Sequence, residues 1–261
     1  MTIQQICTLL ETWAAPAAAE SYDNVGLLVG FPHHEVTGIL INLDVTEDLI
    51  AEAKALNVNL IVTHHPIWFM PRKRLNGEDY VSRIIMSAIK NDIALYAIHT
   101  NLDNVRTGVN RKMAEKIGLE NLSFLQEKKS PIPELGAGMI GTLPKPLEKS
   151  AFLRHIKDTF HCGGIRYADA PLDAIQKVAI CGGAGSSLVS QAILQGADAF
   201  VTADITYHKF FDNENKLLFL DIGHYESEQF TSELIYNYIS EKMPNFALYL
   251  SKVNTNPVKY G

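Results

Sequence analysis

The chain has 261 residues, 47% of them hydrophobic and 20% charged, as in a soluble globular protein with one large or two moderate domains. Its formal net charge of −6 argues against a dedicated nucleic-acid-binding protein, which normally presents an excess of Lys and Arg. No apolar stretch could span a bilayer, no signal-peptide pattern begins the chain, and three scattered cysteines fit a reducing cytoplasm.

The first half of the chain alternates between helical and strand patterns. Apolar residues recur at helical spacing over 2–13, and further helices are expected after Thr46, over 81–90 and over 108–117, the last ending at Gly118. Buried strands are expected at 38–45, 60–63 and 93–99. Strand–helix alternation at this rhythm predicts an α/β fold with much parallel pairing.

The second half begins with a proline-rich region, 128–147, that has the composition of turns and linkers. After it we expect helices at 148–160, 206–214 and 225–242, and strands at 177–181, 199–203, 216–221 and 246–252. The glycine-rich loop 182–187 lacks the pattern of a nucleotide-binding loop and favours a tight turn over phosphate binding. The predicted organisation is two α/β modules with a metal site in the cleft between them. A discontinuous metal-binding module comprises 1–127 and 222–261, and the second module comprises 128–221.

Ligand-type residues follow three of the predicted strands. His64 and His65 end the apolar run 60–63, just before a proline, and Asp103 follows the strand that ends near His99. His224 and Glu228 come after the strand 216–221, and their spacing of four places both side chains on one helical face. Because ligands bind at the carboxyl ends of strands in open α/β sheets, these side chains predict a common site.

The donor set has more members than one catalytic zinc ion normally takes from protein, which is about three. Three imidazoles and two carboxylates suit a dinuclear centre that activates water. Nitrogen and oxygen donors without a thiolate favour Zn, Mn, Fe or Co. A single histidine at a strand end is more often structural, but three such segments make coincidence less probable.

Four sequence blocks carry a resemblance to one family: 21–27 (SYDNVGL), 63–66 (THHP), 99–103 (HTNLD) and 223–228 (GHYESE). The chain resembles the type-2 GTP cyclohydrolase I homologues, also called NGG-interacting-factor-three-like dinuclear metal-centre proteins, in the short form without a mid-chain insert. The resemblance implies two divalent metal ions per subunit and a toroidal homohexamer with its metal sites facing an internal cavity. It also implies hydrolytic opening of the guanine imidazole ring of GTP at C8, with release of formate. The implied ligands are His64, His65, Asp103, His224 and Glu228.

Other polar residues have two readings each. His99 is either a structural histidine or a proton shuttle. The block containing Asp23 and Asn24 reads as a simple turn, whereas the resemblance places it where either residue could hydrogen-bond to a metal ligand. Asp204 and His208 follow the strand 199–203 and are candidates for substrate contact or acid–base work, or else a helix cap and an exposed histidine.

The leading hypothesis is a dinuclear metal-dependent hydrolase that acts on a small, nucleotide-like molecule, with His99 or His208 as the catalytic proton relay. The alternative is a ring-shaped metal-binding scaffold or regulatory protein without turnover. A third hypothesis, nucleic-acid binding through the ring, is disfavoured by the acidic charge.

Overall fold

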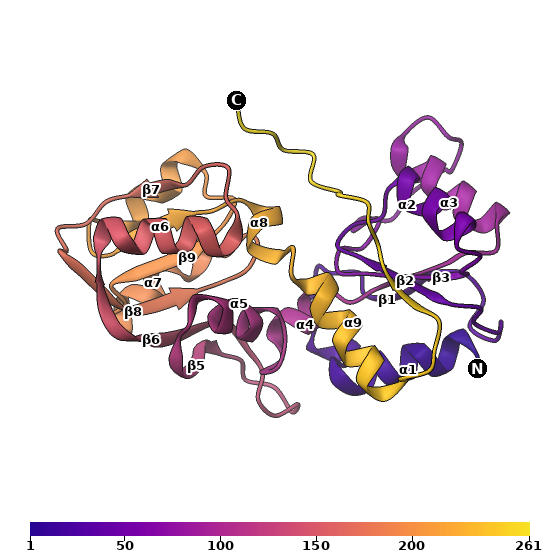
Figure 1. The fold of residues 1–261 in the computed structure, drawn as a ribbon, viewed down its shortest axis with the longest axis horizontal. Coiled ribbons are helices and arrows are strands. Elements are labelled where there is room, and N and C mark those ends of the chain that lie inside the picture. Colours follow the sequence, from indigo (N-terminus) through magenta and orange to yellow (C-terminus); the bar gives the residue numbers. More distant parts are fainter. The chain divides into compact units, whose positions relative to one another are not determined.

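The computed structural model describes residues 1–261, which form two compact units (Figure 1). Unit 1 comprises Met1–Leu102 and Thr231–Thr255, and unit 2 comprises Asp103–Phe230 and Asn256–Gly261. The sequence placed the junctions near 127 and 221. In the structure, residues 103–127 belong to unit 2 because α5 (Val109–Ile117) packs against α6 (Lys149–Phe160) and because β5 (Glu120–Glu127) pairs with β6 (Gly136–Glu148).

Unit 1 is built on a five-stranded sheet in the order β1-β4-β3-β2-β11. The four strands from β4 to β11 are parallel, and β1 is antiparallel to β4 at one edge. Parallel strands need crossover connections, and helices supply them here. The predicted α/β fold with parallel pairing is therefore confirmed. The strands are β1 (Gly26–Val29), β2 (Ile39–Asn42), β3 (Leu60–Thr63), β4 (Ala94–Ala97) and β11 (Leu248–Leu250).

Helices cover both faces of this sheet (Figure 1). On one face, α2 (Glu47–Ala55) and α3 (Tyr80–Lys90) pack onto a core that includes Leu40, Ile61 and Leu95. On the other lie α1 (Ile3–Trp13) and α9 (Thr231–Lys242), joined by a stack of Trp13 on Tyr238 with ring centroids 4.2 Å apart. The short segments η1 (Pro16–Ala18) and α4 (Thr100–Asn104) complete the unit, and α4 continues into unit 2. All residues of β2, β3 and β4 are buried, which explains their continuous apolar runs.

Unit 2 has a six-stranded mixed sheet in the order β5-β6-β8-β9-β10-β7. The central strands β8, β9 and β10 are parallel, and the outer ones are antiparallel to their neighbours. Its helical elements are α5, α6, α7 (Val189–Leu194), η2 (Ser186–Leu188), η3 (Tyr207–Asn213) and α8 (His224–Glu228). The remaining strands are β7 (Arg166–Ala168), β8 (Ala174–Ile180), β9 (Ala199–Thr202) and β10 (Leu218–Asp221).

The structure differs from three local predictions. The region 128–147 is largely strand, because β6 accommodates Pro144 and Pro146 where its pairing with β8 is interrupted, so no ladder hydrogen bond is required of them. The helix predicted at 206–214 is the 3₁₀ segment η3. The helix predicted at 225–242 is two helices, α8 in unit 2 and α9 in unit 1, because the chain passes from one unit to the other after the buried Phe230.

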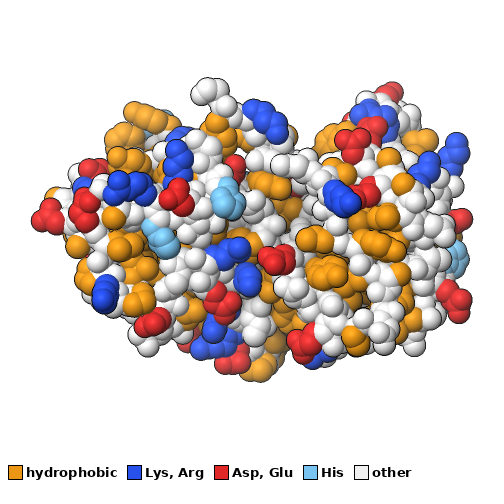
Figure 2. Space-filling model, viewed as in Figure 1, with side chains coloured by type: hydrophobic (Ala, Val, Ile, Leu, Met, Phe, Trp, Pro, Cys, Tyr) orange, Lys and Arg blue, Asp and Glu red, His pale blue; other side chains and the backbone are white.

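No helix of the structure combines the length and the apolarity needed to cross a bilayer. On the face drawn in Figure 2, acidic and basic side chains are interspersed among hydrophobic ones, without an extended basic surface. This distribution agrees with the acidic net charge of the sequence.

Candidate metal centre

Three histidines gather at the carboxyl ends of β3 and β4 in unit 1. The ring centroids of His64 and His65 are 4.9 Å apart, and that of His99 lies 5.1 Å from the first and 5.3 Å from the second. One nitrogen from each ring can be chosen so that all three lie within 4.8 Å of one another. The parallel course of the strands produces this arrangement, because it brings the residues that follow them to one edge. The three rings are thus candidate ligands of a common ion.

The orientation of His64 is set by the backbone. Its ring is fully buried, and Nδ1 lies 2.8 Å from the carbonyl oxygen of Ile98. Because a carbonyl oxygen only accepts hydrogen bonds, Nδ1 carries the proton and donates it. The lone pair of the neutral ring is then on Nε2, the atom through which such a histidine binds a metal.

A carboxylate orients His65 in the same way. Its Nδ1 lies 2.7 Å from Oδ1 of Asp44, which follows the end of β2, and Asp44 also accepts a 2.6 Å hydrogen bond from the Thr255 hydroxyl. Burial raises the pKa of the Asp44 carboxyl, but the hydrogen bonds from His65 and Thr255 outweigh it and hold the pKa below its usual value. Asp44 therefore stays ionised and keeps the proton of His65 on Nδ1.

His99 has a corresponding partner in Asp23, whose side chain is fully buried. The Asp23 carboxylate accepts hydrogen bonds from His99 Nδ1 at 2.9 Å, from the Thr100 amide at 3.0 Å and from the Thr100 hydroxyl. Burial raises the pKa of this carboxyl, yet these hydrogen bonds lower it to about 2. The block at 21–26 is thus more than a turn, and of Asp23 and Asn24 it is Asp23 that holds a site histidine.

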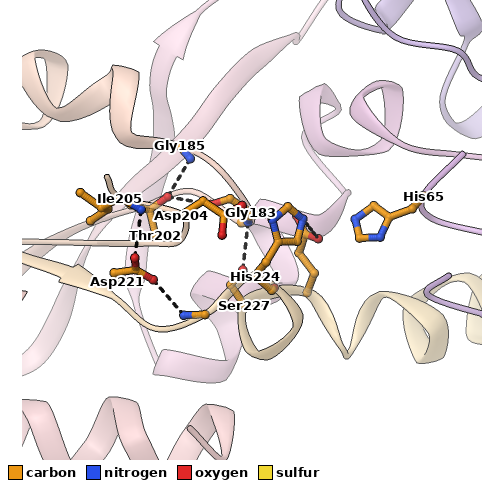
Figure 3. Close-up of polar contacts among 12 residues, drawn as sticks. His65, Gly183, Gly185, Thr202, Asp204, Ile205, Asp221, His224 and Ser227 are labelled. Atoms are coloured by element: carbon orange, nitrogen blue, oxygen red, sulfur yellow. Dashed lines mark hydrogen bonds and ion pairs between the residues drawn. The ribbon is translucent and has the colours of Figure 1, made fainter. Parts of the chain in front are cut away.

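In unit 2, His224 and Glu228 occupy the first and last positions of α8. His224 Nδ1 lies 2.7 Å from Oδ2 of Asp204 (Figure 3), and its Nε2 lies 3.1 Å from Oε2 of Glu228. The predicted spacing on one helical face is therefore present in the geometry. Burial opposes a charge on this imidazole, but the two carboxylates outweigh burial and raise the pKa of His224 to about 11. The pair of carboxylates forms an environment suited to a cation.

Asp221 joins the two segments that deliver Asp204 and His224 (Figure 3). Its buried carboxylate accepts hydrogen bonds from the Ile205 amide at 2.9 Å and from the Gly223 amide at 3.1 Å, and it pairs with Arg166. These contacts fix the loop after β9 and the start of α8 relative to each other. Asp204 is thereby held where it can bind Nδ1 of His224.

The glycine-rich loop after β8 wraps around α8. A side chain at Gly183 would place its Cβ 2.4 Å from Oε1 of Glu228 and 3.2 Å from Cε1 of His224, and the backbone φ of Gly183 is +60°. Its amide donates a 2.9 Å hydrogen bond to Oγ of Ser227, and its carbonyl accepts a 3.0 Å hydrogen bond from the Thr202 hydroxyl (Figure 3). The loop is a tight turn, as predicted, and glycine is required there by the closeness of two candidate ligands.

Two further residues predicted for the site are Asp103 and His208. Asp103 belongs to α4, and its backbone carbonyl accepts a 3.0 Å hydrogen bond from the Asn110 side chain. His208 is exposed in η3, where its ring contacts Tyr207 and Phe211. His64, His65 and His99 belong to unit 1, and Asp103, His224 and Glu228 belong to unit 2.

Sequence reasoning missed Asp44, the carboxylate that orients His65. The signal for Asp44 was its place near the carboxyl end of a buried strand, as for His64 and His65. It could be used only once β2 was known to lie beside β3.

The donor set fits borderline divalent cations, because imidazole Nε2 atoms and carboxylate oxygens are their usual protein ligands. The fold and these residues define a two-unit α/β protein with a candidate divalent-metal centre.

Comparison with known proteins identifies the family of the chain. The family model for Duf34/NIF3 (NGG1p interacting factor 3) matches residues 1–257, and the chain belongs to this family. A Clostridium perfringens protein called GTP cyclohydrolase 1 type 2 homolog is 38% identical over 229 residues, which are 87% of each chain. The structure of Staphylococcus aureus protein SA1388 matches with a TM-score of 0.90 and 30% identity, covering 100% of this chain and 99% of that one. A Bacillus cereus protein related to NIF3 gives a TM-score of 0.93 at 25% identity, with the same coverage.

Proposed function

We propose that this chain is a hydrolase that depends on two divalent metal ions held by His64, His65, Asp103, His224 and Glu228. The main support is the hydrogen bonding at Nδ1 of the imidazoles, which sets their orientation. Nδ1 of His64, His65 and His224 faces the Ile98 carbonyl, Asp44 and Asp204, respectively. Such hydrogen bonds orient the rings of metal ligands and raise their basicity, so that each presents Nε2.

The ions, which we propose to be Zn, Mn, Fe or Co, would lower the pKa of a water molecule and supply a hydroxide nucleophile at neutral pH. Proton transfer then falls to residues of the chain. Because Asp23 accepts the proton on Nδ1 of His99, Nε2 of that ring is the basic atom, and the buried carboxylate stabilises the imidazolium formed when it takes up a proton. We propose His99 as the proton relay, with His208 as a second candidate.

The proposed substrate class is a nucleotide. The Clostridium perfringens relative is named a GTP cyclohydrolase 1 type 2 homolog, so GTP is the first substrate to test and other nucleotides are the next. We further propose a homohexameric ring, as the resemblance in the sequence blocks implies, and a cytoplasmic location, which the scattered cysteines favour. Light scattering on purified protein tests this assembly independently of activity.

Elemental analysis of native protein tests the centre directly. We expect two divalent ions per chain in the wild type, and loss of metal in Glu228→Gln, which keeps the shape of the side chain and removes its charge. Glu233→Gln is the matched control, because Glu233 is exposed on α9. Absence of bound metal from native and metal-supplemented protein would contradict the proposal.

Turnover separates the hydrolase from the metal-binding scaffold. We expect formate release from GTP, or hydrolysis of another nucleotide, by metal-loaded wild type, and strongly reduced turnover in His99→Gln with its metal content retained. A metal-loaded ring that hydrolyses no member of a broad nucleotide panel, and that dissociates when Glu228→Gln removes the metal, would favour the scaffold.

A further inference from the structure

We propose that unit 1 has a second binding site, a pocket for a small amphipathic amine between β1, α3 and the segment that follows His65. The pocket has a volume of about 370 Å³, within the range of small-molecule sites. Gly30 and Ala94, at the adjoining ends of β1 and β4, both line it and contribute no bulky side chain. The pocket therefore results from small residues that the fold places at this point.

The walls of the pocket are apolar. Buried Val29 and Ile85 lie inside, and Trp68 is half-buried against the same core. At its mouth, Phe31 and Ile89 are 63% and 56% exposed, which is high for large hydrophobic side chains. An apolar ligand body of matching size would remove these surfaces from water.

The charge of the pocket selects a cation. Its lining includes Asp92 and no Lys or Arg, so no permanently charged cation there would neutralise a phosphate or a carboxylate. The other titratable side chain of the lining is His34, whose ring centroid lies 4.8 Å from that of Phe31. Asp92 is exposed and has no ion-pair partner, while the Trp68 and Phe31 rings add faces that attract cations. A protonated amine at the end of an apolar body satisfies both features.

The position of Asp92 supports this reading independently. It lies two residues beyond the end of α3 with φ of +53°, a left-handed conformation that Asn also adopts readily. The partial negative charge at the helix C-terminus opposes a carboxylate there. Asn would adopt this backbone conformation equally well without that repulsion. The carboxylate of Asp, unlike an amide, can form an ion pair with a cationic ligand.

The pocket is distinct from the histidine cluster but shares a segment with it. Ala94 begins β4, whereas His99 follows its other end. The Trp68 carbonyl accepts a 3.0 Å hydrogen bond from Asn24, next to Asp23, and the Phe69 ring lies 5.6 Å from that of His99. A ligand that contacts Trp68 therefore touches the chain beside the cluster, as an effector would.

Three compounds with the same apolar body test the proposal: 4-phenylbutylamine, 4-phenylbutanol and 4-phenylbutanoate. Each is titrated into the full chain, with and without chelator, and followed by calorimetry and by tryptophan fluorescence. Trp68 lines the pocket, and the second tryptophan, Trp13, is stacked on Tyr238. We expect the amine to bind at least about three-fold more tightly than the alcohol, the carboxylate to bind most weakly, and the fluorescence change to be absent in Trp68→Phe.

Two surface variants identify the charge responsible. Asp92→Asn keeps the backbone preference, and we expect it to reduce amine affinity to that of the alcohol while leaving alcohol affinity unchanged. Ile89→Lys places a cation of the chain on the pocket wall, three residues before Asp92, and we expect it to weaken amine binding as well. Equal affinity for amine and alcohol in the wild type, no saturable amine binding, or a retained amine preference in Asp92→Asn would each overturn the proposal. Titration under chelator makes the result independent of the metal centre.

Discussion

Replacing Gly183 by Ala should weaken metal binding in addition to its cost to the fold. The new Cβ would lie 2.4 Å from Oε1 of Glu228, whereas ordinary van der Waals contact begins at 3.4 Å. The oxygen must therefore move by about 1 Å, the difference between these two distances. Because Oε1 is the end of a flexible side chain, it can move without disturbing the core. Its movement would, however, shift the whole carboxylate, whose Oε2 lies 3.1 Å from Nε2 of His224.

Gly196→Ala is the matched control. Gly196 has φ of +68°, close to the +60° of Gly183, and a Cβ there would meet nothing within 4 Å. Both variants should therefore lose about 1–2 kcal/mol of unfolding free energy, the cost of a left-handed backbone in a residue with a Cβ. Only Gly183→Ala adds the displacement of Glu228. We expect its metal affinity to fall about 10- to 100-fold, the effect typical of changes around a metal ligand.

The assay has two parts: urea denaturation of chelator-treated protein gives the free energy of unfolding, and calorimetric titration with Zn²⁺ or Mn²⁺ gives the affinity. If both variants bind metal equally well, the loop does not position Glu228 for a metal and the reasoning is refuted.

Three further predictions concern buried groups. The pKa of Asp23, about 2, lies below its ordinary 3.8, so its stabilising contribution of about 2 kcal/mol should be complete above pH 4 and disappear as the pH falls towards 2. Asp23→Asn should therefore be less stable than chelated wild type at pH 6 but not at pH 2 in urea denaturation; a pH-independent difference would contradict this. The buried Tyr96 hydroxyl has no hydrogen-bond partner, so Tyr96→Phe should keep or gain up to about 1 kcal/mol of stability, and a loss of more than that in the same assay would show an unrecognised partner. Burial raises the pKa of Cys7 and Cys162 to about 12, so at pH 8 iodoacetamide should modify the partly exposed Cys181 first by mass spectrometry, and earlier labelling of either buried thiol would be contrary to this.

Much of the site could be predicted because it depends on local patterns. The apolar runs that end at His64 and Asp221 identify buried strands by composition, and the edge where parallel strands end is a general property of the fold. The spacing of His224 and Glu228 likewise needs only the geometry of one helical turn.

The rest depends on which strands become neighbours, and sequence patterns do not contain that information. Asp44 becomes the partner of His65 only because β2 lies beside β3, and Asp204 meets His224 because β9 pairs with β10. The strand β6 was missed because two prolines in the interior of a strand are normally disqualifying. They are tolerated at an irregularity in pairing with β8 that only the structure reveals.

The chain passes between its two units after residues 102, 230 and 255. A ribosome making this protein therefore releases every residue of unit 2 except the last six before it releases α9 and β11 of unit 1. Until then β2 remains an unprotected edge, and Asp44 lacks the hydroxyl of Thr255. Nascent chains of this protein therefore complete most of the second unit before the sheet of the first gains its last strand and Asp44 its last hydrogen-bond donor.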